Sequence, residues 1–229
     1  MSDHPSSVPA EQSVNRTNSV PSEQMRAVRA FVSAVMGRCA DDRGARAALR
    51  SGLGKPLDRV PRMHSIVAPL LPSWVMGKAD AERAYYAVAS MIALLPKDEI
   101  QAAQKSLDSD GSDTDRYGQS LGSSLAEAVA SGTRKGLRES AAETRINLLT
   151  KQSVEGLHRH LPATIRQLQG VGTSIDYARL VSDLLRWRHY RGDISRRWLQ
   201  DFYRDRFKAD RDAAQQADTE TETDPVSQT

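Results

Sequence analysis

The sequence predicts an all-α protein with two helical, bundle-like parts, a flexible acidic linker between them and disordered tails at both ends. Apolar residues recur at the three- and four-residue spacing of amphipathic helices over most of residues 22–209. No segment has the apolar–polar alternation of a strand, and aromatic residues make up only 5% of the chain. A chain of 229 residues can form one large domain or two small ones.

The first predicted part covers residues 21–105 and follows a polar tail, residues 1–20, that should be disordered. Ser22 is expected to cap its first helix. Pro69 should kink or divide the third helix, and Pro96 should end the fourth. The four helical patterns cover residues 22–38, 43–51, 61–71 and 79–95.

The second predicted part covers residues 116–210, after an acidic linker at residues 106–115 that marks the domain boundary. A short basic loop should join its last two helices, which carry clear apolar stripes. The acidic tail at residues 211–229 should be disordered. Helices are expected at residues 116–131, 139–150, 153–170, 174–188 and 192–209. The stripes of the last two are Tyr177, Leu180, Val181, Leu184 and Leu185, then Ile194, Trp198 and Phe202.

Positive charge is concentrated in the predicted helical parts. Residues 21–108 carry a net charge of +4 and residues 116–211 carry +8, whereas the rest of the chain is acidic and lowers the total to +3. Arginine dominates, and its planar guanidinium suits phosphates and stacks on bases. An ordered cationic surface of this kind favours nucleic acid as the binding partner.

Other functions find little support in the sequence. The single cysteine, Cys39, excludes an intrachain disulfide and fits a reducing compartment. The N-terminus lacks signal-peptide features, and the longest apolar run is too short to span a membrane, so we expect a cytoplasmic protein. His158 and His160 are two residues apart on a helix, cannot share a metal and should be surface histidines. We find no catalytic constellation and expect no cofactor, no metal and no enzymatic activity.

Three groups of basic residues are less compensated by acidic neighbours in the sequence than the other basic residues are. Like charges repel at one-turn spacing, and positive charge near a helix N-terminus opposes the macrodipole, so bound phosphates would relieve both conflicts. By contrast, Asp176, Arg179, Asp183 and Arg186 alternate in sign and are typical of a solvated helix face. The three groups are Arg46 with Arg50, Arg134 with Lys135 and Arg138, and Arg191 with Arg196 and Arg197.

A series of short motifs runs through both parts in a recognisable order. The first part contains RAALR at 46–50, YAVA at 86–89 and ALLP at 93–96. The second contains SLG at 120–122, ASG at 130–132, ETRINLL at 143–149, IDY at 175–177 and WLQDFY at 198–203. Together they resemble the CasB family, the small subunit of the type I-E CRISPR interference complex Cascade. The resemblance covers about residues 22–208.

The resemblance implies an all-helical, non-catalytic protein. Two copies would line the inner face of Cascade, beside the large subunit and against the backbone subunits that carry the CRISPR guide RNA. Their expected role is to bind the target and displaced non-target DNA strands and so to stabilise the R-loop. Guide pairing supplies the sequence information, so backbone-directed cations suffice for this role.

The resemblance also implies particular binding residues. The basic residue of the ETRINLL segment is Arg145, and Arg166 lies ten residues before the aspartate of the IDY motif, Asp176. Arg50 ends the RAALR helix, where Ser51 replaces a second basic residue frequent in the family. The basic loop before the last helix is represented by Arg191, with Arg196 nearby. Two further candidates from a looser alignment are Lys78 and Arg83.

Two other interpretations of the same residues remain open. The chain could be a structural helical adaptor whose arginines form salt bridges with other proteins, in which case DNA affinity would be low at any salt concentration. A nuclease or other phosphoryl-transfer enzyme would need a clustered acidic metal site, which the sequence does not provide.

Overall fold

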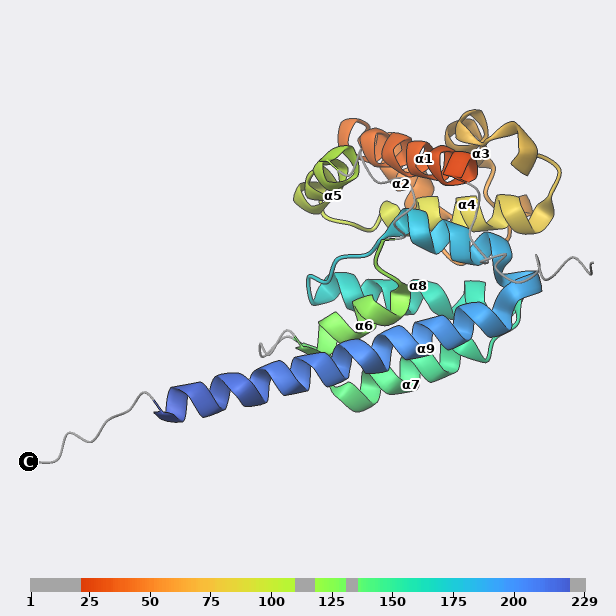
Figure 1. Cartoon of the computed structure of the whole chain (residues 1–229). Helices are drawn as coiled ribbons and strands as arrows, with labels where there is room; N and C mark the ends of the chain where they lie inside the picture. The colour runs from red at the N-terminus through yellow and green to blue at the C-terminus, as the bar shows by residue number, and fades with distance from the viewer. Residues whose placement is uncertain (1–21, 110–117, 131–135, 223–229) are drawn as a thin grey trace, which may run out of the picture.

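A computed structural model describes residues 22–109, 118–130 and 136–222 of the chain (Figure 1). All regular secondary structure within these ranges is helical, which confirms the all-α prediction. The predicted tail at residues 1–20 and most of the predicted linker lie outside the described residues.

The first four α-helices follow the sequence pattern closely. They are α1 (Ser22–Asp41), α2 (Arg43–Ser51), α3 (Pro61–Val67) and α4 (Ala79–Ile92). Asp42 caps α2, because its side-chain Oδ1 accepts hydrogen bonds from the backbone N–H groups of Gly44 and Ala45 at 2.7 and 3.0 Å. The chain between α3 and α4 forms short 3₁₀ turns, and Pro69 lies in the first of these, as its predicted role as a helix divider requires.

Helix α5 (Lys97–Ser109) is absent from the sequence prediction. It begins directly after Pro96, whose carbonyl accepts the N–H of Ile100 at 3.1 Å. Ile100 is fully buried, and α5 packs along α1. The helix was missed because Ile100 is the only strongly apolar residue among residues 97–103, the part of α5 whose side chains the structure describes. The helix extends into the predicted linker, of which residues 110–115 lie outside the described ranges.

Three further helices precede the longest one. They are α6 (Leu121–Ala130), α7 (Glu139–Thr150) and α8 (Val154–Gly170). Helix α6 begins later than predicted, at Leu121, and the preceding Ser120 hydroxyl accepts the N–H of Ser123 at 3.3 Å. Ser153 caps α8 by accepting the N–H of Gly156 at 3.2 Å.

The last helix, α9 (Tyr177–Glu222), consists of two arms that meet at a bend (Figure 1). The backbone of Tyr190 leaves the helical region there, at φ −125° and ψ 27°. The first arm, residues 177–189, runs along α4, and the second arm, residues 191–222, runs back past α6 and α7. These arms correspond to the two helices that the apolar stripes predict.

The second arm continues to Glu222, well past its predicted end at residue 209, and its last turns project away from the rest of the protein (Figure 1). Residues 211–222 are therefore helical in the structure, whereas the sequence predicted a disordered tail from residue 211. The arm contains neither Gly nor Pro after Gly192 that could end it. Pairs such as Arg206 and Asp210, at 2.7 Å, add support one turn apart.

The hydrophobic core runs through both predicted parts. Side chains from α1, α4, α6, α8 and both arms of α9 belong to one apolar cluster. Trp187 on the first arm and Trp198 on the second pack against each other at 5.1 Å between ring centroids, and both are almost fully buried. The two arms of α9 thus pack against each other in the core, whereas residues 188–192 at the bend are exposed. A polar network, described next, also joins the arms.

Candidate nucleic-acid interface

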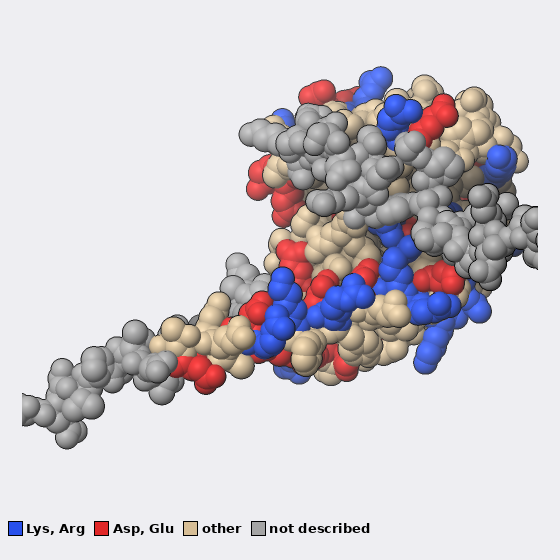
Figure 2. Space-filling view, in the orientation of Figure 1, with Lys and Arg blue, Asp and Glu red and all other residues tan. Residues whose placement is uncertain are grey.

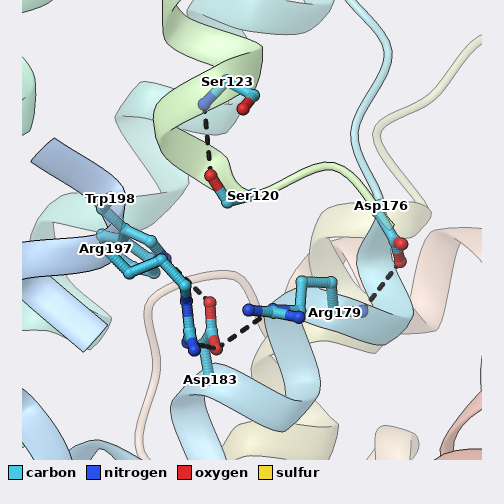
Figure 3. A network of polar contacts seen from close by, with 7 residues as sticks. All are labelled: Ser120, Ser123, Asp176, Arg179, Asp183, Arg197 and Trp198. Atoms are coloured by element: carbon cyan, nitrogen blue, oxygen red, sulfur yellow. Dashed lines mark hydrogen bonds and ion pairs between the residues drawn. The ribbon is translucent and has the colours of Figure 1, made fainter. Parts of the chain in front are cut away.

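A buried carboxylate holds the two arms of α9 together (Figure 3). Asp183 on the first arm has a side chain only 1% exposed. Its Oδ1 accepts a hydrogen bond from the guanidinium of Arg197, and its Oδ2 accepts one from the indole Nε1–H of Trp198, both at 2.7 Å. Arg179 lies one turn before Asp183, with its Nε 3.3 Å from Oδ1. The carboxylate therefore neutralises guanidinium charge inside the fold.

This network corrects the prediction that Arg179 and Asp183 belong to a solvated helix face. The side chain of Arg179 is only 5% exposed, so both groups are internal. Alternating charge at helical spacing does not show which face of a helix meets the core, and the second arm of α9 covers this one. Arg197, predicted as a nucleic-acid contact, is committed to the same network and is mostly buried.

Arg46 also makes contacts inside the fold. Its Nε donates to the carbonyl oxygen of Ala93 at 3.1 Å, and its Nη2 donates to that of Leu95. These carbonyls follow the end of α4, so the guanidinium satisfies acceptors that the helix leaves open. Arg50, one turn further along α2, is exposed and forms no salt bridge with any described residue. The two arginines of this predicted group therefore differ in their surroundings.

A further group of basic residues, which the sequence did not predict to lie together, is found where the 52–57 loop, α4 and α8 meet. Lys55, Arg83 and Arg159 line a cavity of about 320 Å³ there, together with Glu155. Of these, only Arg83 was predicted as a binding residue. A signal for Arg159 was present, because it precedes Arg166 by seven residues, about two helical turns, and both are exposed on α8. Lys55 reaches the cavity because of the path of the 52–57 loop, and no helical spacing to another basic residue could have predicted this position.

His158 lies in the wall of this cavity and is not the surface histidine that the sequence predicted. Only 7% of it is exposed, and its Nδ1 has no hydrogen-bond partner among the described residues. Burial and the nearby Arg83 guanidinium lower the pKa of His158 to about 4, so the imidazole is neutral near pH 7. The positive charge at the cavity therefore comes from the lysine and arginines.

The bend of α9 carries a second exposed basic region next to α4. Arg188 bonds to Asp80 of α4, and this contact holds the pKa of the Asp80 carboxyl below its usual range. Arg191 is exposed, and Arg196 is 67% exposed with a carboxylate of Asp193 at 3.2 Å. Lys78, directly before α4, is also exposed.

An arginine and an aromatic ring stack on the surface of the same bend. The guanidinium carbon of Arg186 lies 5.0 Å from the ring centroid of Tyr190, which is 43% exposed. Exposed aromatic rings beside cations are a common platform for unpaired bases. The sequence reading treated Arg186 as part of a solvated face and did not select Tyr190.

The remaining predicted residues lie on or near α7. Arg138 occupies the position before its first turn and is exposed. Arg145, in the middle of the helix, is half-buried and forms no salt bridge with another described residue. Arg134 and Lys135 lie outside the described residues.

The basic side chains are unevenly distributed over the surface (Figure 2). In that view basic side chains gather along α9, where acidic side chains lie between them. No group of three or more His, Cys, Asp or Glu residues within the described ranges could hold a metal ion. Among the described helices, none is both long enough and apolar enough to cross a membrane.

Comparison with known proteins identifies the family. The family described as CRISPR-associated protein Cse2 matches residues 45–203. A chain of a solved "CRISPR RNA-guided surveillance complex" is 34% identical, with 82% of this chain and 98% of that chain covered and a TM-score of 0.67. A second such complex, described as pre-nicking, gives 33% identity, coverage of 83% and 99%, and a TM-score of 0.67. CasB from Thermus thermophilus shares the fold at 23% identity, coverage of 81% and 99%, and a TM-score of 0.55.

No curated protein matches the chain by sequence. The family match covers well over half of its residues, and the chain therefore belongs to the Cse2 family of CRISPR-associated proteins, for which CasB is another name. This membership confirms the resemblance drawn from the sequence motifs. The family is not known to be catalytic.

Proposed function

We propose that this chain is the small subunit of a Cascade-type CRISPR surveillance complex and binds nucleic acid there through its basic surfaces. The proposal rests on the similarity of this chain to a chain of a solved RNA-guided surveillance complex, which is matched over nearly its whole length. Its partners would be the backbone and large subunits, the guide RNA and the two target DNA strands, with two copies of this chain in each complex.

The proposed mechanism uses cations that no described carboxylate neutralises. Arg50, Arg145, Arg166 and Arg191 form no salt bridge with other described residues, so each is available to a phosphate. R-loop formation exchanges one duplex for another of similar stability, so a few phosphate contacts can shift the balance. By holding the displaced and target strands, these arginines would stabilise the R-loop without reading its sequence.

Binding of single-stranded DNA to the isolated full chain, measured by fluorescence anisotropy at several salt concentrations, tests the proposal. We expect dissociation constants in the micromolar range at low salt, no sequence preference, and a log–log salt slope of roughly −0.7 for each phosphate contacted. Absence of binding at low salt would contradict strand binding by the free subunit. Co-purification with the backbone subunits then tests the place in the complex separately.

The alternative function is that of a structural adaptor acting only through protein–protein contacts. It is favoured by the number of arginines already paired with carboxylates, such as Arg188 with Asp80 and Arg206 with Glu139. An adaptor would co-purify with the complex but show little DNA affinity at any salt concentration, so the same two measurements separate the functions.

A further inference from the structure

The cavity between the 52–57 loop, α4 and α8 combines two kinds of lining. Its volume of about 320 Å³ lies at the lower end of the range of roughly 300–1,000 Å³ that small-molecule sites occupy. One part of the wall is apolar and includes Leu57, Met63 and Pro162. The other part carries Lys55, Arg83 and Arg159. A ligand that fills it should therefore have a flat or apolar body and a negative charge.

The charge around the cavity is unbalanced in favour of an anion. Three cations face one carboxylate, that of Glu155, since the nearby Asp80 is bonded to Arg188 on α9. The buried His158 is neutral near pH 7 and adds no charge. Lys55 and Arg159 are exposed, so their long side chains can move toward a phosphate, while Arg83 is half-buried at the wall.

The wall of the cavity is shaped by close packing around the loop. A Cβ on Gly52 would lie 1.9 Å from the sulfur of Met63, so any larger residue there would displace the Met63 side chain from its place in the cavity wall. Gly54 has a positive φ of 70° and turns the chain just before Lys55. The hydroxyl of Tyr86 on α4 forms a hydrogen bond with Nδ1 of His64 on α3 at 2.6 Å and is held in place. The site is therefore preformed.

We propose that this cavity binds one unstacked nucleotide of a nucleic-acid strand, with the base against the apolar wall and its flanking phosphates on Lys55, Arg83 and Arg159. The inference rests on the proposed function, because it assigns one nucleotide of the bound strand to a specific site. A free inorganic anion would leave the apolar wall unfilled, and a neutral apolar compound would leave the three cations unpaired. A nucleotide can place its base against the apolar wall and its phosphates beside the three cations.

The first test uses thymidine 5′-monophosphate and the full-length chain, with the Met63 methyl group followed by ¹³C NMR. We expect a saturable shift of the Met63 signal, while buried Met36 on α1 stays unchanged. Inorganic phosphate at the same concentration should leave the Met63 signal in place. An equal shift with phosphate alone, or no shift with the nucleotide, would overturn the proposal.

A cavity-filling variant shows whether the nucleotide enters the cavity. Ala87 lines it from α4, and Ala87→Leu extends into the empty volume without changing charge. This variant should lose the nucleotide response, whereas Ala141→Leu on the exposed side of α7 should keep it. Lys55→Gln, at an exposed position, should weaken nucleotide binding several-fold. Retention of the full response by both Ala87→Leu and Lys55→Gln would contradict the assignment.

The second test compares a thymidine decamer with an abasic decamer of the same charge. One accommodated base should favour the thymidine strand by at least about fivefold, and Ala87→Leu should remove this preference. Salt-dependent binding of both strands with no preference would overturn the cavity assignment and leave the proposed function intact. A Met63 response to the nucleotide without binding of either decamer would support the cavity but contradict strand binding by the free subunit.

Discussion

At the scale of single residues, burial decides the chemistry of groups whose sequence context looks ordinary. His158 shares a helix with exposed Arg159 and Arg166, yet its ring is buried against α4 and its pKa falls to about 4. The unfolded chain keeps the usual value near 6.5. Between these two values the folded state binds fewer protons than the unfolded state. The contribution of His158 to the free energy of unfolding is therefore fully present above about pH 6.5 and is lost as the pH falls toward 4.

We expect the free energy of unfolding of His158→Gln to fall less steeply than that of the wild type as the pH is lowered. The wild-type chain should lose about 3 kcal/mol more than the variant between about pH 7 and pH 4, the equivalent of the lowered pKa. Urea unfolding at a series of pH values measures the difference. Acidic groups that do not interact with His158 titrate in both proteins and cancel in the comparison. His189→Gln, at an exposed position, is the control, and an identical acid slope in wild type and His158→Gln would contradict the burial argument.

At the scale of elements, α6 approaches the second arm of α9 so closely that a side chain between them has no room. A Cβ on Gly122 would lie 2.0 Å from the carbonyl oxygen of Trp198, a backbone atom that cannot rotate away. These two helices make the most extensive helix–helix contact among the described residues. The glycine of the SLG motif is therefore explained by packing.

Gly122→Ala should force α6 and α9 apart and destabilise the fold by about 3 kcal/mol, near the upper end of overpacking costs. Thermal or urea unfolding measures the loss. The matched variant is Gly170→Ala, because a Cβ at that position meets nothing within 4 Å. It should change stability by less than about 1 kcal/mol in either direction. Equal stabilities of the two variants would show that the helices can separate freely.

The bend in α9 depends on a charge network as well as on packing. Removing the Asp183 carboxylate would leave the guanidinium groups of Arg179 and Arg197 without their buried counter-charge and the indole N–H of Trp198 without its acceptor. A buried ion pair that loses one partner is costly, because the remaining charge stays in a poorly solvated environment.

Asp183→Ala should therefore lower the free energy of unfolding by about 3–5 kcal/mol. Asp193→Ala breaks the exposed contact with Arg196 and should cost less than about 1 kcal/mol, as surface ion pairs do. Chemical unfolding of both variants gives the comparison. Equal stability of Asp183→Ala and Asp193→Ala would show that the Asp183 network does not stabilise the packing of the two arms of α9.

At the scale of the whole molecule, the location of charge matters more than its total. The formal net charge is only +3, but exposed arginines on α2, directly before α7, on α8 and at the bend of α9 form several cationic regions. A strand that touches more than one of them would gain affinity from each phosphate contacted. Charge reversal at chosen positions can therefore distinguish a defined path of the strand across the surface from non-specific electrostatic attraction.

Charge reversal of Arg145 and Arg166 to Glu should weaken R-loop stability in the assembled complex and leave folding and assembly intact. The physical reason is that neither arginine forms a salt bridge with another described residue, so the fold does not depend on their charge. R-loop lifetime and co-purification are the two readouts. Reversing exposed Arg38 and Arg62 changes the net charge equally and should have a smaller effect on the R-loop. Collapse of assembly would instead assign Arg145 and Arg166 a structural role.

The local pattern of the chain was sufficient to predict most helices. The stripes around Leu180 and Trp198 are buried as predicted, and Cys39 lies in the core. Periodicity succeeds here because each of these helices buries one continuous apolar face. Periodicity failed for α5, where Ile100 is the only strongly apolar residue among those whose side chains the structure describes, and for the end of α9, where the helix continues beyond the core.

The sequence by itself determined the all-helical architecture, the excess of arginine and the family, because helical periodicity, composition and ordered motifs are properties of the chain. Only the tertiary structure decided which cations face solvent. Arg179 and Arg197 became internal because two arms of one helix fold over Asp183, and Lys55, Arg83 and Arg159 came together from distant segments. Burial and proximity between segments depend on how the helices pack, and no local pattern of residues records that.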